Sequence, residues 1–188
     1  MSDAETTTTG RQHGDVDPER QLAAVRQIRT VGDPVLREHA KPVVAFDRAL
    51  KDLSRRMIRI MHDAPGIGLA APQIGVTRRV IVYDLERPVT LVNPEIVSRS
   101  AETEIMDEGC LSVPDAVVAV ERPARIRVRG RDLRGRELEY DAEDLEARVI
   151  QHELDHLDGI LILERTSREE RARALRGLRR PEPAGTAF

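Results

Sequence analysis

Aromatic residues are scarce in this chain of 188 residues, which has two tyrosines, two phenylalanines and no tryptophan. The core must therefore be built from aliphatic side chains, and a protein that stacks single-stranded nucleic acid on aromatic rings is disfavoured. Cysteine occurs once, at Cys110, so an internal disulfide is excluded and a reducing compartment is favoured. The net charge of −3 gives the whole molecule no attraction to DNA or to anionic membranes.

Long apolar runs are also missing, so no segment is predicted to span a membrane. Residues 1–21 contain several acids and no apolar stretch, unlike a secretory signal or an Arg-rich transit peptide. The length and the hydrophobic fraction of 40% indicate one globular domain. We expect a soluble, cytoplasmic monomer that binds neither DNA nor membranes.

The chain divides into four predicted segments. Residues 1–24 are polar and Thr-rich, which predicts a flexible leader. Residues 25–165 form the predicted main domain, and residues 166–180 form a basic helix whose capping box joins Ser167 and Glu170. Residues 181–188 are a predicted flexible tail.

Hydrophobic periodicity predicts the elements of the first part of the main domain. Residues 48–64 carry apolar side chains at helical spacing and predict an amphipathic helix. The β-branched runs predict strands over residues 80–85, 90–97 and 116–120. Alternation of polar and apolar residues over 124–141 predicts a hairpin with one solvent-exposed face.

The remaining elements include a helix that we expect to be buried. Residues 142–159 carry apolar residues in two stripes, with Asp141 as the predicted N-cap and Gly159 just past the C-terminus. The apolar run 160–163 predicts a short strand. Because no strand–helix–strand order repeats, we predict an α+β fold in which antiparallel strands and hairpins pack around the buried helix.

The sequence HELDH (152–156) on this helix is a candidate metal-binding motif. Positions i and i+4 lie one turn apart on the same face, so His152 and His156 can reach one metal ion. Glu153 lies on the flank of the pair, where it can take a proton from a water whose pKa the metal lowers to roughly 7. The alternative is a pair of ordinary helix histidines, but burying two unpaired imidazoles in an apolar helix would be costly.

A catalytic metal usually has three protein ligands, so the site needs one more. No histidine follows His156, and the candidates are Glu164 or another downstream acid, Cys110, and the histidines His13, His39 and His62. A lone buried cysteine is by default a small apolar filler, so the motif alone does not choose Cys110.

The segment GIGLAAPQ (66–73) begins with the pattern of a dinucleotide-binding fingerprint. That fingerprint requires a strand before it and a helix after it, whereas here a helix precedes it and Pro72 follows it. We interpret the segment as a loop that lets the backbone approach a substrate, with Gln73 supplying a side-chain N–H donor.

Taken together, three segments resemble the signature motifs of the peptide deformylases: GIGLAAPQ (66–73), EGCLS (108–112) and QHELDH (151–156). The flanking segments 28–43 and 91–97 also look like family sequence, so the similarity covers residues 25–165. It implies a catalytic metal hydrolase domain that removes the formyl group from the N-terminal methionine of newly made proteins and releases formate. Family members usually hold Fe(II), although Zn, Ni or Co can occupy such a site.

The resemblance also implies a role for individual residues. Cys110, His152 and His156 would bind the metal, and Glu153 would be the general acid and base. Gln73 and the backbone N–H of Leu111 would form an oxyanion hole. The remaining matches are pocket residues for the methionine side chain (Ile67, Met106, Leu145 and Val149), Gly68 against the substrate backbone, and a supporting ion pair (Glu108 and Arg122).

Two departures from the family pattern concern the outer substrate groove. Glu164 and Asp115 replace residues that are commonly Asp and Gly, and aromatic residues near the site are missing.

Two alternatives to a deformylase are a zinc endopeptidase with the same HExxH helix and a non-catalytic interaction protein. The seven arginines among residues 165–180 also suggest docking on ribosomal RNA, with a solvated edge helix as the alternative.

Overall fold

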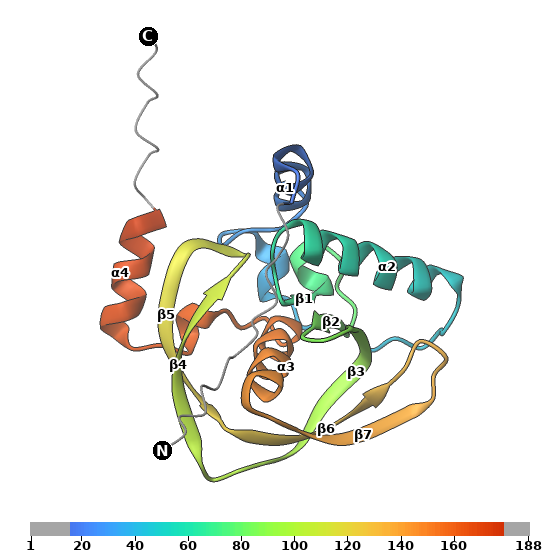
Figure 1. Ribbon diagram of the computed structural model, residues 1–188. Coiled ribbons are helices and arrows are strands. Elements are labelled where there is room, and N and C mark those ends of the chain that lie inside the picture. Colours follow the sequence, from blue (N-terminus) through green and yellow to red (C-terminus); the bar gives the residue numbers. More distant parts are fainter. Residues whose placement is uncertain (1–15, 179–188) are drawn as a thin grey trace, which may run out of the picture.

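The computed structural model describes residues 16–178 (Figure 1). Four α-helices are present in this part of the chain: α1 (Pro18–Val25), α2 (Arg48–Asp63), α3 (Asp144–Leu157) and α4 (Arg168–Leu178). Three short 3-10 helices accompany them: η1 (Pro34–Arg37), η2 (Ala71–Ile74) and η3 (Ile162–Glu164). The strands are β1 (Gly68–Ala70), β2 (Val80–Asp84), β3 (Pro88–Arg99), β4 (Thr103–Cys110), β5 (Val113–Pro123), β6 (Arg125–Arg131) and β7 (Glu137–Glu143).

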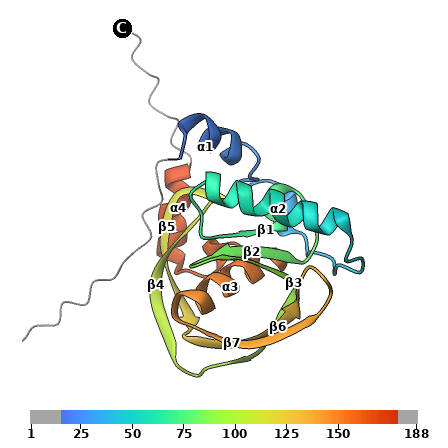
Figure 2. The ribbon, with the colours of Figure 1, turned by 45° about the vertical axis from the view of Figure 1, so that its right-hand side comes forward.

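The strands form two antiparallel sheets that surround α3. The larger sheet has the order β1-β2-β3-β6-β7, and β4 pairs with β5 alone. Figures 1 and 2 show α3 in the centre, enclosed by strands of both sheets, with α2 outside β1 and β2. The predicted α+β class, with antiparallel strands around a buried helix, is therefore confirmed.

Aliphatic side chains fill three core clusters, as the scarcity of aromatic residues requires. One cluster joins α2 to β1 and β2, the second packs α3 on the large sheet, and the third lies between β5, η3 and α4. The two tyrosines tie α3 to the large sheet: the hydroxyls of Tyr83 and Tyr140 are 2.9 Å apart, and Tyr83 donates to Glu146 at 2.8 Å. The HELDH motif thus lies on a helix that aliphatic packing and a hydrogen bond from Tyr83 hold against the large sheet.

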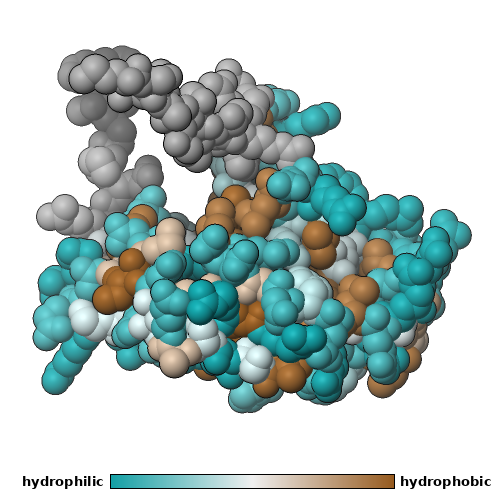
Figure 3. Space-filling model, turned by 60° about the horizontal axis from the view of Figure 1, so that its bottom comes forward, coloured by the Kyte–Doolittle hydropathy of each residue, from teal (hydrophilic) through white to brown (hydrophobic). Residues whose placement is uncertain are grey.

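The hairpin predicted over residues 124–141 is confirmed as β6 and β7. Its outer face carries a ladder of ion pairs, in which Arg127 and Arg129 each contact Glu139 at 2.8 Å. Figure 3, which brings the bottom of Figure 1 forward, shows a mostly hydrophilic surface with small hydrophobic patches. Helix α2 and the strands predicted over 80–85, 90–97 and 116–120 are also confirmed, although β3 and β5 are longer than expected.

The predicted boundaries of α3 are correct at one end only. Gly159 follows the helix with φ of 73°, as predicted for this position. The predicted N-cap is wrong, because Asp141 lies in β7, which stays paired with β6 as far as Glu143. The helix therefore begins at Asp144, with Glu143 at the N-cap position.

The strand predicted over residues 160–163 is also wrong. Leu161, Ile162 and Leu163 are all buried in the third core cluster rather than paired in a sheet. The N–H of Glu164 donates to the Leu161 carbonyl at 2.9 Å, which closes the 3-10 turn η3, and the Glu164 carboxylate caps the turn by accepting from the N–H of Leu161 at 2.9 Å. An apolar run of four residues does not distinguish these two conformations.

Two elements were not expected from the sequence. Strand β4 was not predicted because most of its residues are exposed, apolar Ile105 and Met106 included, so burial does not alternate along it. The Gly-rich segment, expected to be a loop, forms β1 and η2, and β1 pairs with β2.

The expectation of a flexible leader is wrong for residues 18–24, which belong to α1. The Asp17 side chain accepts from the N–H of Glu19 at 3.1 Å, and Pro18 occupies the first helical position. Ala24 and Ile28 are buried against α2, which fixes the helix to the domain. Residues 1–15 and the predicted tail 181–188 lie outside the described residues.

Helix α4 occupies most of the predicted segment 166–180, of which residues 179 and 180 lie outside the described part. The N–H of Glu170 donates to the Ser167 hydroxyl at 3.1 Å, as the capping box requires. A capping box also requires the Glu170 side chain to accept from the backbone N–H of Ser167. It accepts instead from the N–H of Ala119 in β5 at 3.1 Å, so this half of the prediction is wrong. No helix within residues 16–178 is long and apolar enough to cross a membrane.

The turn after α3 generates a stability prediction. Gly159 has a left-handed backbone conformation, with φ of 73°, that residues with a side chain rarely adopt. A Cβ added at this position would also lie 2.6 Å from the Arg37 carbonyl oxygen. We expect Gly159→Ala to lower the free energy of unfolding by at least about 2 kcal/mol, measured by denaturant titration. As a control, Gly177→Ala in α4 adds a Cβ that meets no atom within 4 Å, so stability should not fall. Equal stability of the two variants would contradict this account of the turn.

Candidate active site

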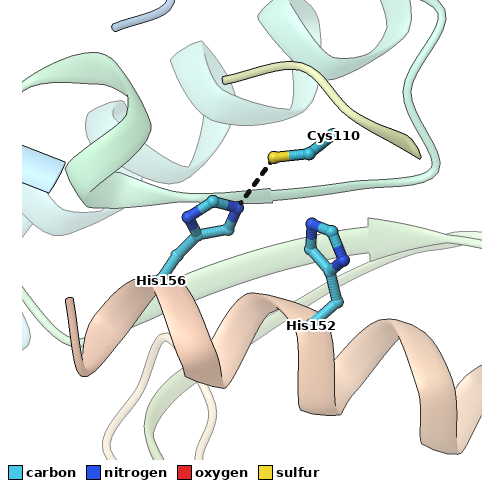
Figure 4. Close-up of side chains that lie close together, drawn as sticks. All are labelled: Cys110, His152 and His156. Atoms are coloured by element: carbon cyan, nitrogen blue, oxygen red, sulfur yellow. Dashed lines mark hydrogen bonds between the residues drawn. The ribbon is translucent and has the colours of Figure 1, made fainter. Parts of the chain in front are cut away.

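Three potential metal ligands converge on one face of α3. His152 and His156 project from adjacent turns of the helix toward Cys110, which ends β4 (Figure 4). One donor atom from each residue lies within 4.8 Å of the other two. The Cys110 Sγ is 3.2 Å from His156 Nε2. This is the cluster that the sequence resemblance implies.

Local strand geometry turns Cys110 toward α3. The register between β4 and β5 shifts after Gly109, so that Cys110 pairs with Val113 across a tight connection. A bulge of this kind bends the strand and redirects a side chain. The other sequence candidates within the described residues are elsewhere: His62 contacts Asp84, Glu164 pairs with Arg37, and His39 is outside the cluster.

The donor set fits a divalent transition metal. One thiolate and two imidazoles match the ligands that Zn, Fe and Co accept. Burial lowers the pKa of His156 well below its usual value, so this ring is neutral and its lone pair is available. Burial also opposes charge on His152, but contacts with Cys110 and Glu108 raise its pKa well above the usual value. The surroundings of His152 therefore favour a cation at the ring, whether a proton or a metal ion.

Glu108 organises a buried charge network behind the cluster. Its carboxylate accepts from Arg122 at 2.6 and 2.9 Å, from Arg148 at 2.7 Å and from His152 Nδ1 at 2.9 Å. Although burial raises the pKa of Glu108, the hydrogen bonds from His152 and Arg122 bring it below the ordinary value. Because Glu108 holds the Nδ1 atom of His152, the other ring nitrogen, Nε2, faces the cluster.

The network extends to residues that the sequence reading did not assign. Arg122 also donates to Asp155 at 2.9 Å, and Asp155 accepts in turn from Arg165. Arg148 bonds the carbonyl oxygens of Val120 and Glu104 at 3.1 and 2.8 Å. A signal was available for Arg148, because an arginine four residues before His152 lies on the same face of a buried helix and needs an acidic partner.

Glu153 is a buried carboxylate beside the cluster. Its side chain is almost inaccessible, and within the described residues its Oε2 has no hydrogen-bond partner. Burial raises the pKa of Glu153 to about 7, against the lowering effect of the nearby His152 and Arg122. A carboxyl group in this state can both accept and return a proton near neutral pH.

Gln73 is fixed next to Cys110. Its Oε1 accepts from the N–H of Ala70 at 2.7 Å, which orients the amide. Its Nε2 donates to the Ser112 hydroxyl at 3.2 Å and lies 4.0 Å from the Cys110 Sγ. The amide N–H group therefore points to the same space as the cysteine. Leu111 follows Cys110 and lines that space as well.

A cleft of about 650 Å³ opens onto the cluster. The structure brings to it the five predicted substrate-contacting residues (Ile67, Gly68, Met106, Leu145 and Val149). Gln73, Cys110, Leu111, Glu108, His152 and Glu153 line it too, whereas His156 and Arg122 lie behind it. Gly68 packs so closely on Glu153 that an added Cβ would overlap the carboxylate.

An HExxH helix whose histidines meet a cysteine at the end of a cleft, inside an α+β fold, defines the site of a hydrolase with a candidate metal centre. The family model described as polypeptide deformylase matches residues 25–172. The chain belongs to this family and is an enzyme of the peptide deformylase type. The alternative of a non-catalytic interaction protein is therefore not supported.

Named relatives and solved structures agree with this assignment. The peptide deformylase of Thermotoga neapolitana is 51% identical over 140 residues, covering 74% of this chain and 85% of the relative. The peptide deformylase of Dictyoglomus thermophilum is 51% identical over 146 residues, covering 77% of this chain and 95% of the relative. The crystal structure from Thermotoga maritima matches with a TM-score of 0.74 at 50% identity, covering 74% of this chain and 96% of that one. The crystal structure of the Synechococcus elongatus peptide deformylase in complex with actinonin matches with a TM-score of 0.78 at 42% identity, covering 80% of this chain and 86% of that one.

The buried network predicts a large cost for removing its central charge. In Glu108→Gln, buried Arg148 loses its carboxylate partner and buried Arg122 keeps only Asp155, so we expect the free energy of unfolding to fall by about 3 kcal/mol or more. Denaturant titration measures this change. The control is Glu95→Gln, because Glu95 is 62% exposed and 3.4 Å from Arg129, and its loss should cost less than about 1 kcal/mol. Similar small costs for both variants would mean that the network does not hold α3 to the hairpin.

Proposed function

We propose that this enzyme hydrolyses the N-formyl group of N-formyl-methionine at the N-terminus of newly synthesised proteins and releases formate. The observation that carries the proposal is the meeting of Cys110, His152 and His156 beside the buried carboxylate of Glu153. The printed names of the relatives, which are peptide deformylases, support the same substrate class.

Cys110, His152 and His156 would hold one divalent ion, with Fe(II) proposed from the family resemblance and Zn, Ni or Co as alternatives. When bound, such an ion supplies a Lewis acid and makes a nearby water more acidic. Glu108 supports this role because its bond to Nδ1 fixes the orientation of His152. Arg122 in turn keeps Glu108 ionised and in place.

Glu153 would move the proton that the reaction requires. Its carboxylate takes a proton from the attacking water and returns it to the nitrogen of the leaving amine. The raised pKa of Glu153, about 7, suits both directions of transfer near neutral pH. Burial also keeps bulk water from competing for the proton.

Gln73 and Leu111 would stabilise the developing oxyanion. The Gln73 amide and the backbone N–H of Leu111 flank Cys110, and each would donate a hydrogen bond to the former formyl oxygen. The methionine side chain would lie among Ile67, Met106, Leu145 and Val149, and Gly68 would meet the substrate backbone. These apolar residues line the same cleft as the polar groups.

We further propose a cytoplasmic monomer that contacts ribosomal RNA through α4. Arg168 and Arg176 extend from this helix, whereas Arg171 and Arg173 have acidic partners at 3.5 and 2.7 Å. Leu175 and Leu178 pack on the third core cluster, so removal of α4 would also expose apolar surface. Charge reversal on the helix is therefore a cleaner test than truncation after Glu164.

Replacing Arg168 and Arg176 together with Glu should weaken binding to ribosomes by about tenfold or more at low salt and reduce its salt dependence. Co-sedimentation with ribosomes at several salt concentrations measures this. Hydrolysis of a small formyl peptide should be unaffected. Arg99→Glu, on the exposed part of β3, is the control for a general charge effect. Ribosome binding that does not change in the double variant would end this proposal.

The role of Glu153 is separable from metal binding. Glu153→Gln should keep the fold and the metal content, because the side chain is not a proposed ligand and the amide is isosteric. Loss of the proton carrier should lower kcat by about 10²- to 10⁴-fold with little change in KM. Formate release from a formyl-Met peptide, measured beside metal analysis, tests this.

The ligand variants Cys110→Ala and His152→Ala are the matched comparison. Each should lose the metal together with activity, and stability should fall as well. If Glu153→Gln retained near-normal turnover with its metal bound, the proposed mechanism would be wrong.

A further inference from the structure

Helix α1 contributes a wall of the active-site cleft. Gln21 and Val25, spaced four residues apart, and the following Ile28 line the same cleft as Cys110 and Glu153. This spacing places Gln21 and Val25 on one face of the helix. The family model begins at residue 25, so nearly all of α1 precedes the matched region.

The helix is held in place firmly enough to serve as a binding surface. Ala24 and Ile28 are 3% and 6% exposed and belong to the core cluster that includes Met57 and Ile60 of α2. Arg56 of α2 also donates to the Gln27 side chain at 3.3 Å. Figures 1 and 2 both show α1 beside α2 at the edge of the domain, apart from the sheets. Val25, in contrast, remains 42% exposed.

Exposed hydrophobic side chains gather at this cleft. Of the nine large hydrophobic residues that are exposed within residues 16–178, five line it: Val25, Ile67, Met106, Val117 and Leu145. Such a concentration of exposed apolar surface marks a place that a ligand covers. Asp107 and Asp115 also line the cleft, which disfavours acidic groups in the ligand.

We propose that α1 binds the part of the substrate chain that follows the formyl-methionine and favours apolar over acidic side chains there. The inference rests on the proposed function and extends it, because it assigns a specificity surface to α1, most of which precedes the family region. Val25 supplies the apolar contact, and Gln21 supplies an amide that can bond the extended peptide backbone. The cleft is continuous from this wall to Glu153, so the occupant is the substrate itself.

The test uses the metal-loaded full chain and two kinds of substrate, formyl-Met-Ala and formyl-Met-Ala-X-Ala with X as Leu, Glu or Lys. The wild-type chain should have a higher kcat/KM for the Leu peptide than for the Glu peptide. Val25→Ala should reduce kcat/KM through KM, and the loss should grow with peptide length to about 2- to 10-fold.

Charge variants distinguish a binding role from a structural one. Val25→Lys should raise the preference for Glu over Leu by about 3- to 10-fold, and Val25→Glu should do the same for Lys over Leu. A merely structural role would move all peptides in the same direction. Arg20→Ala, on the same helix but outside the cleft, is the control and should leave every ratio unchanged.

Two failures are distinguishable. If the wild-type chain released no formate from formyl-Met-Ala, the proposed function would be wrong. If formate were released but Val25→Lys did not raise the ratio of Glu to Leu peptide, or Val25→Glu did not raise the ratio of Lys to Leu peptide, only the role of α1 would be overturned. Equal wild-type rates on the Leu and Glu peptides would likewise contradict an apolar wall.

Discussion

The buried carboxylate of Glu108 is the group on which the arrangement of the site depends. It lies on the β4–β5 hairpin, which belongs to neither the large sheet nor the helix. Arg148 and His152 reach it from α3, and Arg122 reaches it from the neighbouring strand. A buried charge is tolerated only when it is paired and hydrogen-bonded, and here every partner also has a positional role. The hairpin that carries Cys110 is thus attached to the helix that carries both histidines.

The rest of the fold keeps that helix fixed. Aliphatic residues of α3, including Ile150 and Leu157, are fully buried against the large sheet. The Tyr83 hydroxyl bonds Glu146 near the start of the helix, and the Arg79–Asp158 pair at 2.7 Å lies at its end. Because the helix is held along its whole length, the reactive groups keep their geometry without support from the solvent side of the cleft.

The sequence predicted the parts of the molecule that a local pattern determines. Periodicity identified α2, α3 and the β6–β7 hairpin, and the spacing of His152, Glu153 and His156 was sufficient to suggest a metal site. Local spacing could not choose Cys110, because the hairpin brings it to α3 from 42 residues away in the chain. Only the combination of three motifs favoured it. Strand β4 was missed because most of its residues are exposed and their burial does not alternate. Residues 160–163 were misassigned because tertiary burial, rather than local preference, decides their conformation.

Two of the three potential ligands share one rigid helix, and the third comes from a separate hairpin. The mutual placement of the two imidazoles is therefore set by helical rise, whereas the position of the thiol is set by the packing of the hairpin on the helix. The distance between the thiol and the imidazoles thus depends on the separation of these two elements. Three ion pairs cross that separation: Arg122 with Asp155, and Glu108 with Arg148 and with His152. Residues that offer no atom to the cluster, such as Arg122 and Arg148, thus help to set the spacing of its three donors.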